Sequence, residues 1–121
     1  MGVTNALEWT FFEQVKIPNS ANEVLLDGEV AKAAFKTVRD FAIFTDLRLI
    51  VIDSQGLTGT KKEIYSLPYK SINMWSTENA GMLDHNTEVE LWTRAGNFKI
   101  KLNKKIDVRQ FEKIIGEAVF K

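Results

Sequence analysis

The chain has 121 residues, of which 45% are apolar and 26% charged, the composition of one ordinary globular domain rather than of a disordered chain. Its 16 basic residues balance 16 acidic ones, so it lacks the basic excess typical of nucleic-acid-binding proteins and polybasic membrane anchors, and we expect no nucleic-acid partner. It has no cysteine and a single histidine, which excludes disulfides, thiolate zinc sites and sites that need two imidazoles.

The sequence also gives no sign of a membrane span or a secretory signal. No apolar run approaches the roughly 20 residues of a membrane-spanning helix. The first residues include acidic Glu8 and Glu13 and lack the basic region that opens a secretory signal. We therefore expect a soluble, cytoplasmic protein.

The N-terminal segment has features of a helix from Asn5 to Lys16. Asn5 can cap it, Glu8 completes a capping box, and Pro18 closes it. Apolar residues at i, i+4 and i+8, widened by two aromatic residues, give it a broad apolar face: Leu7, Phe11 and Val15, with Trp9 and Phe12. A second short helix is predicted between Ser20 and Gly28, so we expect residues 1–28 to form an N-terminal helical extension.

The middle of the chain is rich in strand formers separated by short turns. Asp53–Ser54–Gln55–Gly56 has typical turn composition. Five strands are predicted, at residues 31–38, 39–45, 47–53, 62–67 and 71–77. The longest irregular stretch follows, from residue 79 to residue 86.

The last third alternates strictly between apolar and polar residues, which indicates two strands with one buried face and one wet face. The buried positions are Val89, Leu91 and Thr93 in one strand and Phe98, Ile100 and Leu102 in the next. A helix then begins at Asp107 as N-cap, with one apolar stripe: Val108, Phe111, Ile114, Ile115, Ala118 and Val119. Gly116 interrupts this helix, and we interpret it as a point of close backbone packing.

Seven strands with short connections favour an antiparallel meander, because parallel pairs need a crossover of about a dozen residues. Such a meander bends on itself into a barrel or into two orthogonal sheets, and the single C-terminal helix can close the open end. The predicted fold is therefore mainly β with α: a seven-stranded bent antiparallel barrel over residues 29–121, capped by the C-terminal helix.

Several runs of residues resemble the bacterial pleckstrin-homology (PH) domain family. They are Phe35–Lys36–Thr37–Val38–Arg39–Asp40–Phe41–Ala42–Ile43–Phe44–Thr45–Asp46, then Arg48–Leu49–Ile50, Gln55–Gly56–Leu57–Thr58–Gly59 with Lys61–Lys62, and Tyr69–Lys70–Ser71–Ile72. The resemblance extends from Glu23 to the C-terminus. It implies a PH-like barrel with a C-terminal capping helix, and assembly into ring-shaped homo-oligomers.

Two interpretations of the basic residues in this region stay open. Lys36, Arg39 and Arg48 could form an anion site for an anionic lipid or a phosphate ligand. They could instead be solvated residues that protect exposed strands from aggregation, with Asp40 and Asp46 near enough in sequence to pair with them.

Three aromatic residues are candidates for a subunit interface. Trp92 shares a strand face with Glu88, Glu90 and Arg94, and tryptophan on a polar face is enriched at interfaces. Trp9 and Phe12 widen the apolar face of the N-terminal segment. Each of the three could instead pack on its own chain.

No catalytic arrangement is recognisable, so we predict that the chain is not an enzyme. His85 beside Asp84 has no second strong ligand at strand or helix spacing, and no metal or cofactor site is predicted. The leading hypothesis is a non-catalytic binding and assembly module that forms a ring-like homo-oligomer, with a further protein partner possible. The alternative is a domain that binds anionic lipid or a phosphate ligand at a membrane surface.

Overall fold

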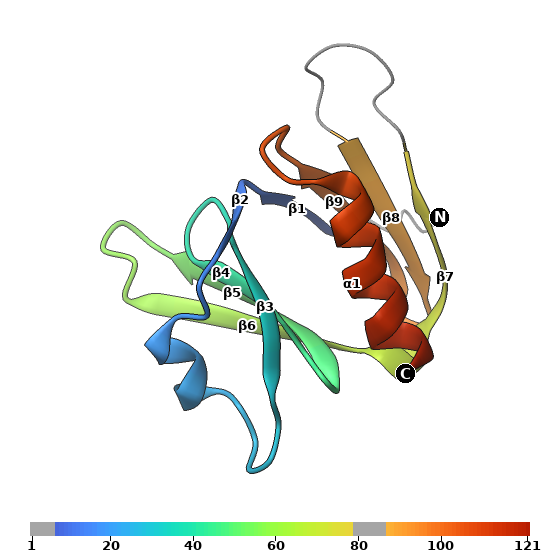
Figure 1. Ribbon diagram of the computed structural model, residues 1–121. Helices are drawn as coiled ribbons and strands as arrows, with labels where there is room; N and C mark the ends of the chain where they lie inside the picture. Colours follow the sequence, from blue (N-terminus) through green and yellow to red (C-terminus); the bar gives the residue numbers. More distant parts are fainter. Residues whose placement is uncertain (1–6, 79–86) are drawn as a thin grey trace.

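The computed structural model describes residues 7–78 and 87–121, and Figure 1 shows their arrangement. In chain order the strands and helices are β1 (Leu7–Phe11), β2 (Glu13–Val15), the 3-10 helix η1 (Asn19–Glu23), β3 (Ala31–Lys36), β4 (Phe41–Thr45), β5 (Arg48–Gln55), β6 (Lys61–Pro68), the 3-10 helix η2 (Tyr69–Ser71), β7 (Ile72–Thr77), β8 (Thr87–Thr93), β9 (Gly96–Leu102) and the helix α1 (Val108–Phe120). The seven strands and the C-terminal helix that the sequence predicts are present.

The strands form two sheets rather than a closed barrel, so the prediction of a closed seven-stranded cylinder is wrong. One sheet has the order β1-β9-β8-β7 and the other the order β2-β3-β4-β5-β6. The chain passes from the second sheet to the first at the corner formed by η2, and α1 lies over the opening between the sheets (Figure 1). Because α1 covers this opening, the core is enclosed there without hydrogen bonds between the strands of the two sheets.

The predicted N-terminal helix is also wrong, because residues 7–15 form two strands. β1 runs parallel to β9, with Trp9 opposite Ile100, and β2 runs antiparallel to β3. The i, i+4, i+8 stripe of Leu7, Phe11 and Val15 fits a strand as well as a helix, since four is a multiple of the strand period of two. The parallel pair also departs from the all-antiparallel meander that the short connections favoured.

The main core lies between the two sheets and α1. It contains a cluster of phenylalanines from both sheets and the helix, with ring centroids between 5.3 and 6.0 Å apart: Phe11, Phe35, Phe44 and Phe111. The carboxylate of Asp107 accepts hydrogen bonds from the backbone N–H groups of Arg109 and Gln110, which confirms the predicted N-cap. Phe111 and Ile115 are buried, whereas Ile114 is half-buried.

A second apolar cluster covers the outer face of the five-stranded sheet. We call residues 16–30, which join β2 to β3, the strap. Its Ala21, Val24 and Leu25 pack on a row of aliphatic residues from β3, β4 and β5: Ala34, Ile43, Ile50 and Ile52. The strands β3, β4 and β5 are therefore buried on both faces, which explains the unbroken apolar run of β5.

Close packing at Gly116 is not found. Apart from its chain neighbours and the backbone of its own helix, a Cβ atom added there would meet nothing within 4 Å. The prediction treated glycine in a helix as a sign of close approach, but the surroundings of this residue are open.

Candidate functional site

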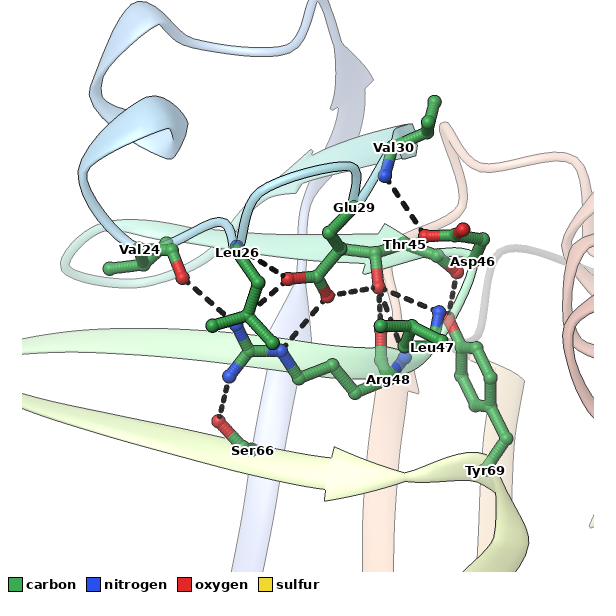
Figure 2. Close-up of polar contacts among 10 residues, drawn as sticks. All are labelled: Val24, Leu26, Glu29, Val30, Thr45, Asp46, Leu47, Arg48, Ser66 and Tyr69. Atoms are coloured by element: carbon green, nitrogen blue, oxygen red, sulfur yellow. Dashed lines mark hydrogen bonds and ion pairs between the residues drawn. The ribbon is translucent and has the colours of Figure 1, made fainter.

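A cluster of hydrogen bonds and one ion pair joins the strap to β4 and β5 (Figure 2). The Arg48 Nε lies 2.9 Å from the Glu29 Oε2, and its Nη2 donates to the Glu29 Oε1 at 3.0 Å. The Thr45 hydroxyl donates to the Glu29 Oε2 at 2.7 Å. The side chain of Glu29 has no exposed surface, so this pair is a buried, two-pronged ion pair.

Two of the remaining N–H donors of Arg48 are also taken up within the chain. Nη2 donates to the Val24 carbonyl oxygen and Nη1 to the Ser66 hydroxyl, both at 2.8 Å. The hydrogen bond from Arg48 is the main cause that lowers the pKa of Glu29, from 4.5 to about 2. The guanidinium therefore fastens the strap to the sheet and has little capacity left for an external anion.

Two further bonds complete this cluster beside the chain corner (Figure 2). The Asp46 Oδ1 accepts from the Val30 N–H at 2.9 Å, and the Tyr69 hydroxyl donates to the Thr45 carbonyl oxygen at 2.6 Å. Burial raises the pKa of Tyr69, so this hydroxyl keeps its proton and remains a donor. These contacts rigidify the cluster rather than expose reactive groups.

The other two predicted anion-site residues lie at the opposite end of the same sheet from Arg48. Lys36 ends β3 at the β3–β4 turn and is exposed, whereas Arg48 begins β5 beside Pro68. The Arg39 Nη2 donates to the Gly56 carbonyl oxygen at 2.8 Å. The structure therefore does not bring Lys36, Arg39 and Arg48 together.

Acidic and polar groups surround the turn that carries Arg39. The Asp40 Oδ2 accepts from the Ser54 hydroxyl at 2.7 Å and lies 3.7 Å from the Lys62 Nζ. Among residues 7–78 and 87–121, no group of three or more histidine, aspartate or glutamate side chains is placed to hold a metal ion. The interpretation of His85 and Asp84 concerns residues outside those described.

Two of the three interface candidates have clear places in the structure. Trp9 stacks on Phe98, with centroids 5.6 Å apart, and meets Tyr65 edge-on at 5.7 Å, so much of its surface is used within its own chain. Phe12 lies between β1 and β2 and is exposed.

Trp92, the third candidate, is half-buried on the outward face of β8. It lies opposite Met74 of β7 on one side and Asn97 of β9 on the other. Met74 is 55% exposed, so the two side chains place an apolar pair on a face that otherwise carries charged residues such as Glu90 and Lys99.

The strand β7 forms the edge of its sheet beside this pair. In the described part of the chain it pairs with β8 alone. Its six residues, INMWST, include no charge, whereas the other long edge strand, β6, begins with Lys61, Lys62 and Glu63. Exposed edges usually carry charges that prevent pairing with another chain. The sequence contained this signal, an uncharged strand, but only the sheet order reveals that β7 is an edge.

A groove of about 520 Å³ lies between α1 and the strands β3 and β4. Its apolar lining comes from Ala33, Phe44, Ile114 and Ala118, and polar residues including Lys32, Asp46 and Glu117 surround it. Sequence patterns could not reveal it, because its two sides are about 70 residues apart in the chain. Separately, no helix among the described residues is long and apolar enough to cross a membrane.

Two packed sheets with a helix over their opening define a PH-like fold, and comparisons with known proteins agree. The model of the bacterial PH domain family matches residues 3–119, so the chain belongs to this family. The "uncharacterized protein YjqA" of Bacillus subtilis (strain 168) is 54% identical over 69 residues, which cover 57% of this chain and 55% of YjqA. The matched region is thus only about half the length of that relative.

Two solved structures show the same architecture. The crystal structure of a DUF1696 family protein with a PH domain from Shewanella loihica PV-4 aligns with a TM-score of 0.79 and 34% identity, covering 88% of this chain and 96% of that one. The PH domain from Shewanella amazonensis SB2B aligns with a TM-score of 0.67 and 36% identity, covering 83% and 84%.

Proposed function

We propose that this chain is a non-catalytic binding and assembly module that associates with copies of itself into a ring-like homo-oligomer through the edge strand β7. The observation that carries this proposal is the uncharged β7 edge beside exposed Met74 and half-buried Trp92. Proteins of this family are typically non-catalytic, and the predicted cytoplasmic location is part of the same proposal.

The physical reason is that β7 offers two kinds of interaction in one place. Its unpaired backbone groups can accept another strand, since ladder hydrogen bonds need no particular side chains. Met74 and Trp92 add apolar surface, and aromatic residues and methionine are enriched where protein surfaces bind one another. Strand pairing between different edges of successive copies forms a ring when the rotation closes.

Light scattering coupled to size-exclusion chromatography tests the proposal with the whole chain. We expect wild type to elute as an oligomer of the 13.8 kDa chain and Met74→Glu to elute as a monomer, because the new carboxylate would be buried against the partner. Leu57→Glu is the matched control: Leu57 is fully exposed in the β5–β6 turn, so the same exchange there leaves the oligomer intact. A wild-type monomer at high concentration would contradict the proposal.

Tryptophan fluorescence gives a second readout. If a neighbouring subunit covers Trp92, diluting wild type red-shifts the emission. Trp92→Phe removes most of that shift, because Trp9 stacks on Phe98 and Trp75 donates its indole N–H to Glu112 within their own chain. Emission that is independent of concentration would count against the contribution of Trp92.

Anionic lipid or phosphate binding remains the alternative, and the geometry supports it less. Of the three predicted residues, Arg48 is held by Glu29 and Arg39 donates to Gly56. If the alternative holds, the protein co-sediments with anionic liposomes, and both added salt and Arg39→Glu lower the fraction of protein in the pellet. No pelleting with any anionic lipid would remove it.

A further inference from the structure

The strap is the long connection between the antiparallel strands β2 and β3, and it folds back over the outer face of their sheet. The ladder between the two strands ends where Val15 lies opposite Ala34. The backbone hydrogen bonds of η1 and of the turn before Glu29 join strap residues to one another. In the described part of the chain residues 16–30 take part in no strand, so the strap can leave the sheet without breaking a ladder.

Hydrogen bonds hold the second half of the strap to the sheet (Figure 2). Arg48 of β5 donates to both carboxylate oxygens of Glu29 and to the Val24 carbonyl oxygen. Asp46 accepts from the Val30 N–H at 2.9 Å and donates its own N–H to the Val30 carbonyl oxygen at 3.0 Å. We call the Glu29–Arg48 pair the latch, because this ion pair joins the strap to the sheet.

The apolar contact under the strap is separate from the main core. Ala33 and Ala34 are neighbours on β3 and point to opposite faces, so Ala33 packs in the main core and Ala34 packs under the strap. Figure 1 shows η1 and α1 on opposite sides of this sheet. Among the apolar side chains of the strap, Ala21 is buried, whereas Val24 and Leu25 are only half-buried. A layer with few buried side chains and no ladder is typical of segments that open locally while the rest of a protein stays folded.

The latch favours the closed strap because Glu29 is buried only when the strap lies on the sheet. Its side chain has no exposed surface, and Arg48 compensates the buried charge with two hydrogen bonds. If Arg48 is removed, the carboxylate regains water only when the strap leaves the sheet. The balance between the closed and the open strap therefore depends on this pair.

We propose that the strap is a latched cover that opens as a unit, while both sheets and α1 stay folded. Opening uncovers the Arg48 guanidinium and a row of aliphatic side chains that the closed strap hides from solvent: Ala34, Ile43, Ile50 and Ile52. The outer face of the five-stranded sheet is thus a second apolar surface that is available only in the open state. This inference does not depend on self-association through β7, because β7 belongs to the other sheet.

Thiol labelling measures the opening directly, because the chain has no cysteine of its own. Ala34→Cys places a thiol under the strap, and Ala42→Cys, the matched control, places one in the main core; both alanines are fully buried. A buried thiol reacts with Ellman's reagent only when opening exposes it. We expect the Ala34→Cys thiol to react at least about tenfold faster than the Ala42→Cys thiol, since only the latter requires the sheets and α1 to separate.

Urea distinguishes local opening from unfolding of the whole domain. The dependence of a labelling rate on urea concentration increases with the surface that the opening uncovers. We expect low urea concentrations to change the Ala34→Cys rate little and the Ala42→Cys rate steeply. Equal rates with the same steep dependence would overturn the proposal, because the strap and the core would then open only together.

Two further variants test the latch in the Ala34→Cys protein. Arg48→Gln should raise the labelling rate about tenfold, whereas Lys101→Ala, which removes the exposed ion pair of the other sheet, should leave the rate unchanged. Circular dichroism checks that each variant stays folded. A labelling rate that Arg48→Gln leaves unchanged would mean that the pair does not hold the strap closed.

Hydrogen exchange of the wild-type chain makes the same comparison if Ala34→Cys does not fold. We expect the backbone amides of η1 to exchange faster than those of β8, and with a weaker dependence on urea. Amides of η1 that are as well protected as those of β8 would overturn the proposal.

Discussion

The two sheets of this domain treat their outer faces in opposite ways. The five-stranded sheet is covered by the strap, so Ile43 and Ile50 on its outer face are fully buried. The four-stranded sheet carries charged residues on its outer face, where Lys101 and Glu8 form an exposed ion pair at 2.9 Å. The comparison teaches that one sheet obtains its second layer from its own chain, whereas the other leaves an uncharged edge and an apolar pair uncovered.

The ion pairs on the two sheets differ in the same way. Glu29 is buried, Arg48 is only 19% exposed, and together they hold the strap to its sheet, whereas Glu8 and Lys101 are both more than 40% exposed. Removing one partner of a buried pair leaves an uncompensated charge in a poorly solvated place, and an exposed pair loses little because water replaces the partner. We therefore expect the largest loss of stability when the Glu29–Arg48 pair is broken.

Arg48→Ala breaks the buried pair and should lower the free energy of unfolding by about 4 kcal/mol, because Glu29 is then buried without a partner. Urea unfolding monitored by circular dichroism measures this effect as a lower midpoint. Lys101→Ala, the matched control on the other sheet, should cost less than about 1 kcal/mol. An equal loss of unfolding free energy in the two variants would mean that the Glu29–Arg48 pair stabilises the protein no more than an exposed ion pair does.

Acid should loosen the strapped sheet through Glu29. Its pKa in the folded protein is about 2, below the value of 4.5 for the free side chain, so its stabilising contribution is full above pH 4.5 and is lost as the pH falls toward 2. The loss can reach about 3 kcal/mol, since each pH unit of displacement corresponds to about 1.4 kcal/mol.

The free energy of unfolding measured from pH 7 to pH 2 checks this sign. Glu29→Gln should flatten the dependence in the acid range, because the amide does not titrate there. An unchanged slope in Glu29→Gln would assign the acid sensitivity to other carboxylates.

The smallest predicted effect concerns α1, which packs against both sheets and belongs to neither outer face. Gly116→Ala should raise the free energy of unfolding by about 1 kcal/mol, because alanine favours a helix and the added methyl group meets open space. Thermal unfolding measures the gain. A loss of stability would mean that the helix needs the glycine for a contact, as its position in the sequence had suggested.

Local patterns predicted the elements that depend on neighbouring residues. Strict alternation at Val89, Leu91 and Ile100 identified β8 and β9, and Asp107 identified the start of α1, because these signals act within a few residues. The N-terminal segment was misread, since Leu7, Phe11 and Val15 satisfy both the helix and the strand period. The segment forms a strand because β1 pairs with the edge of β9 in the folded chain.

The candidate site could be predicted less well than the fold. The sequence singled out Arg48 as a residue for an external anion, but the strap brings Glu29 beside it from 19 residues away. It singled out Trp92 on a polar face, and the sheet order added that Met74 and an open edge lie next to it. Long-range contacts decide whether a basic side chain is already paired within the chain, and they also decide which strand lies at the edge of a sheet.

The sequence by itself determined the family, the strand and helix segments of residues 31–120 and the absence of disulfides, because composition, periodicity and caps are properties of short stretches. The tertiary structure alone decided that β1 joins β9, that the strap covers one sheet, that β7 remains an edge, and that a groove lies between α1 and the strands β3 and β4. The physical reason is that backbone hydrogen bonds and buried apolar faces accept many partners, and only the folding of the whole chain selects which ones meet.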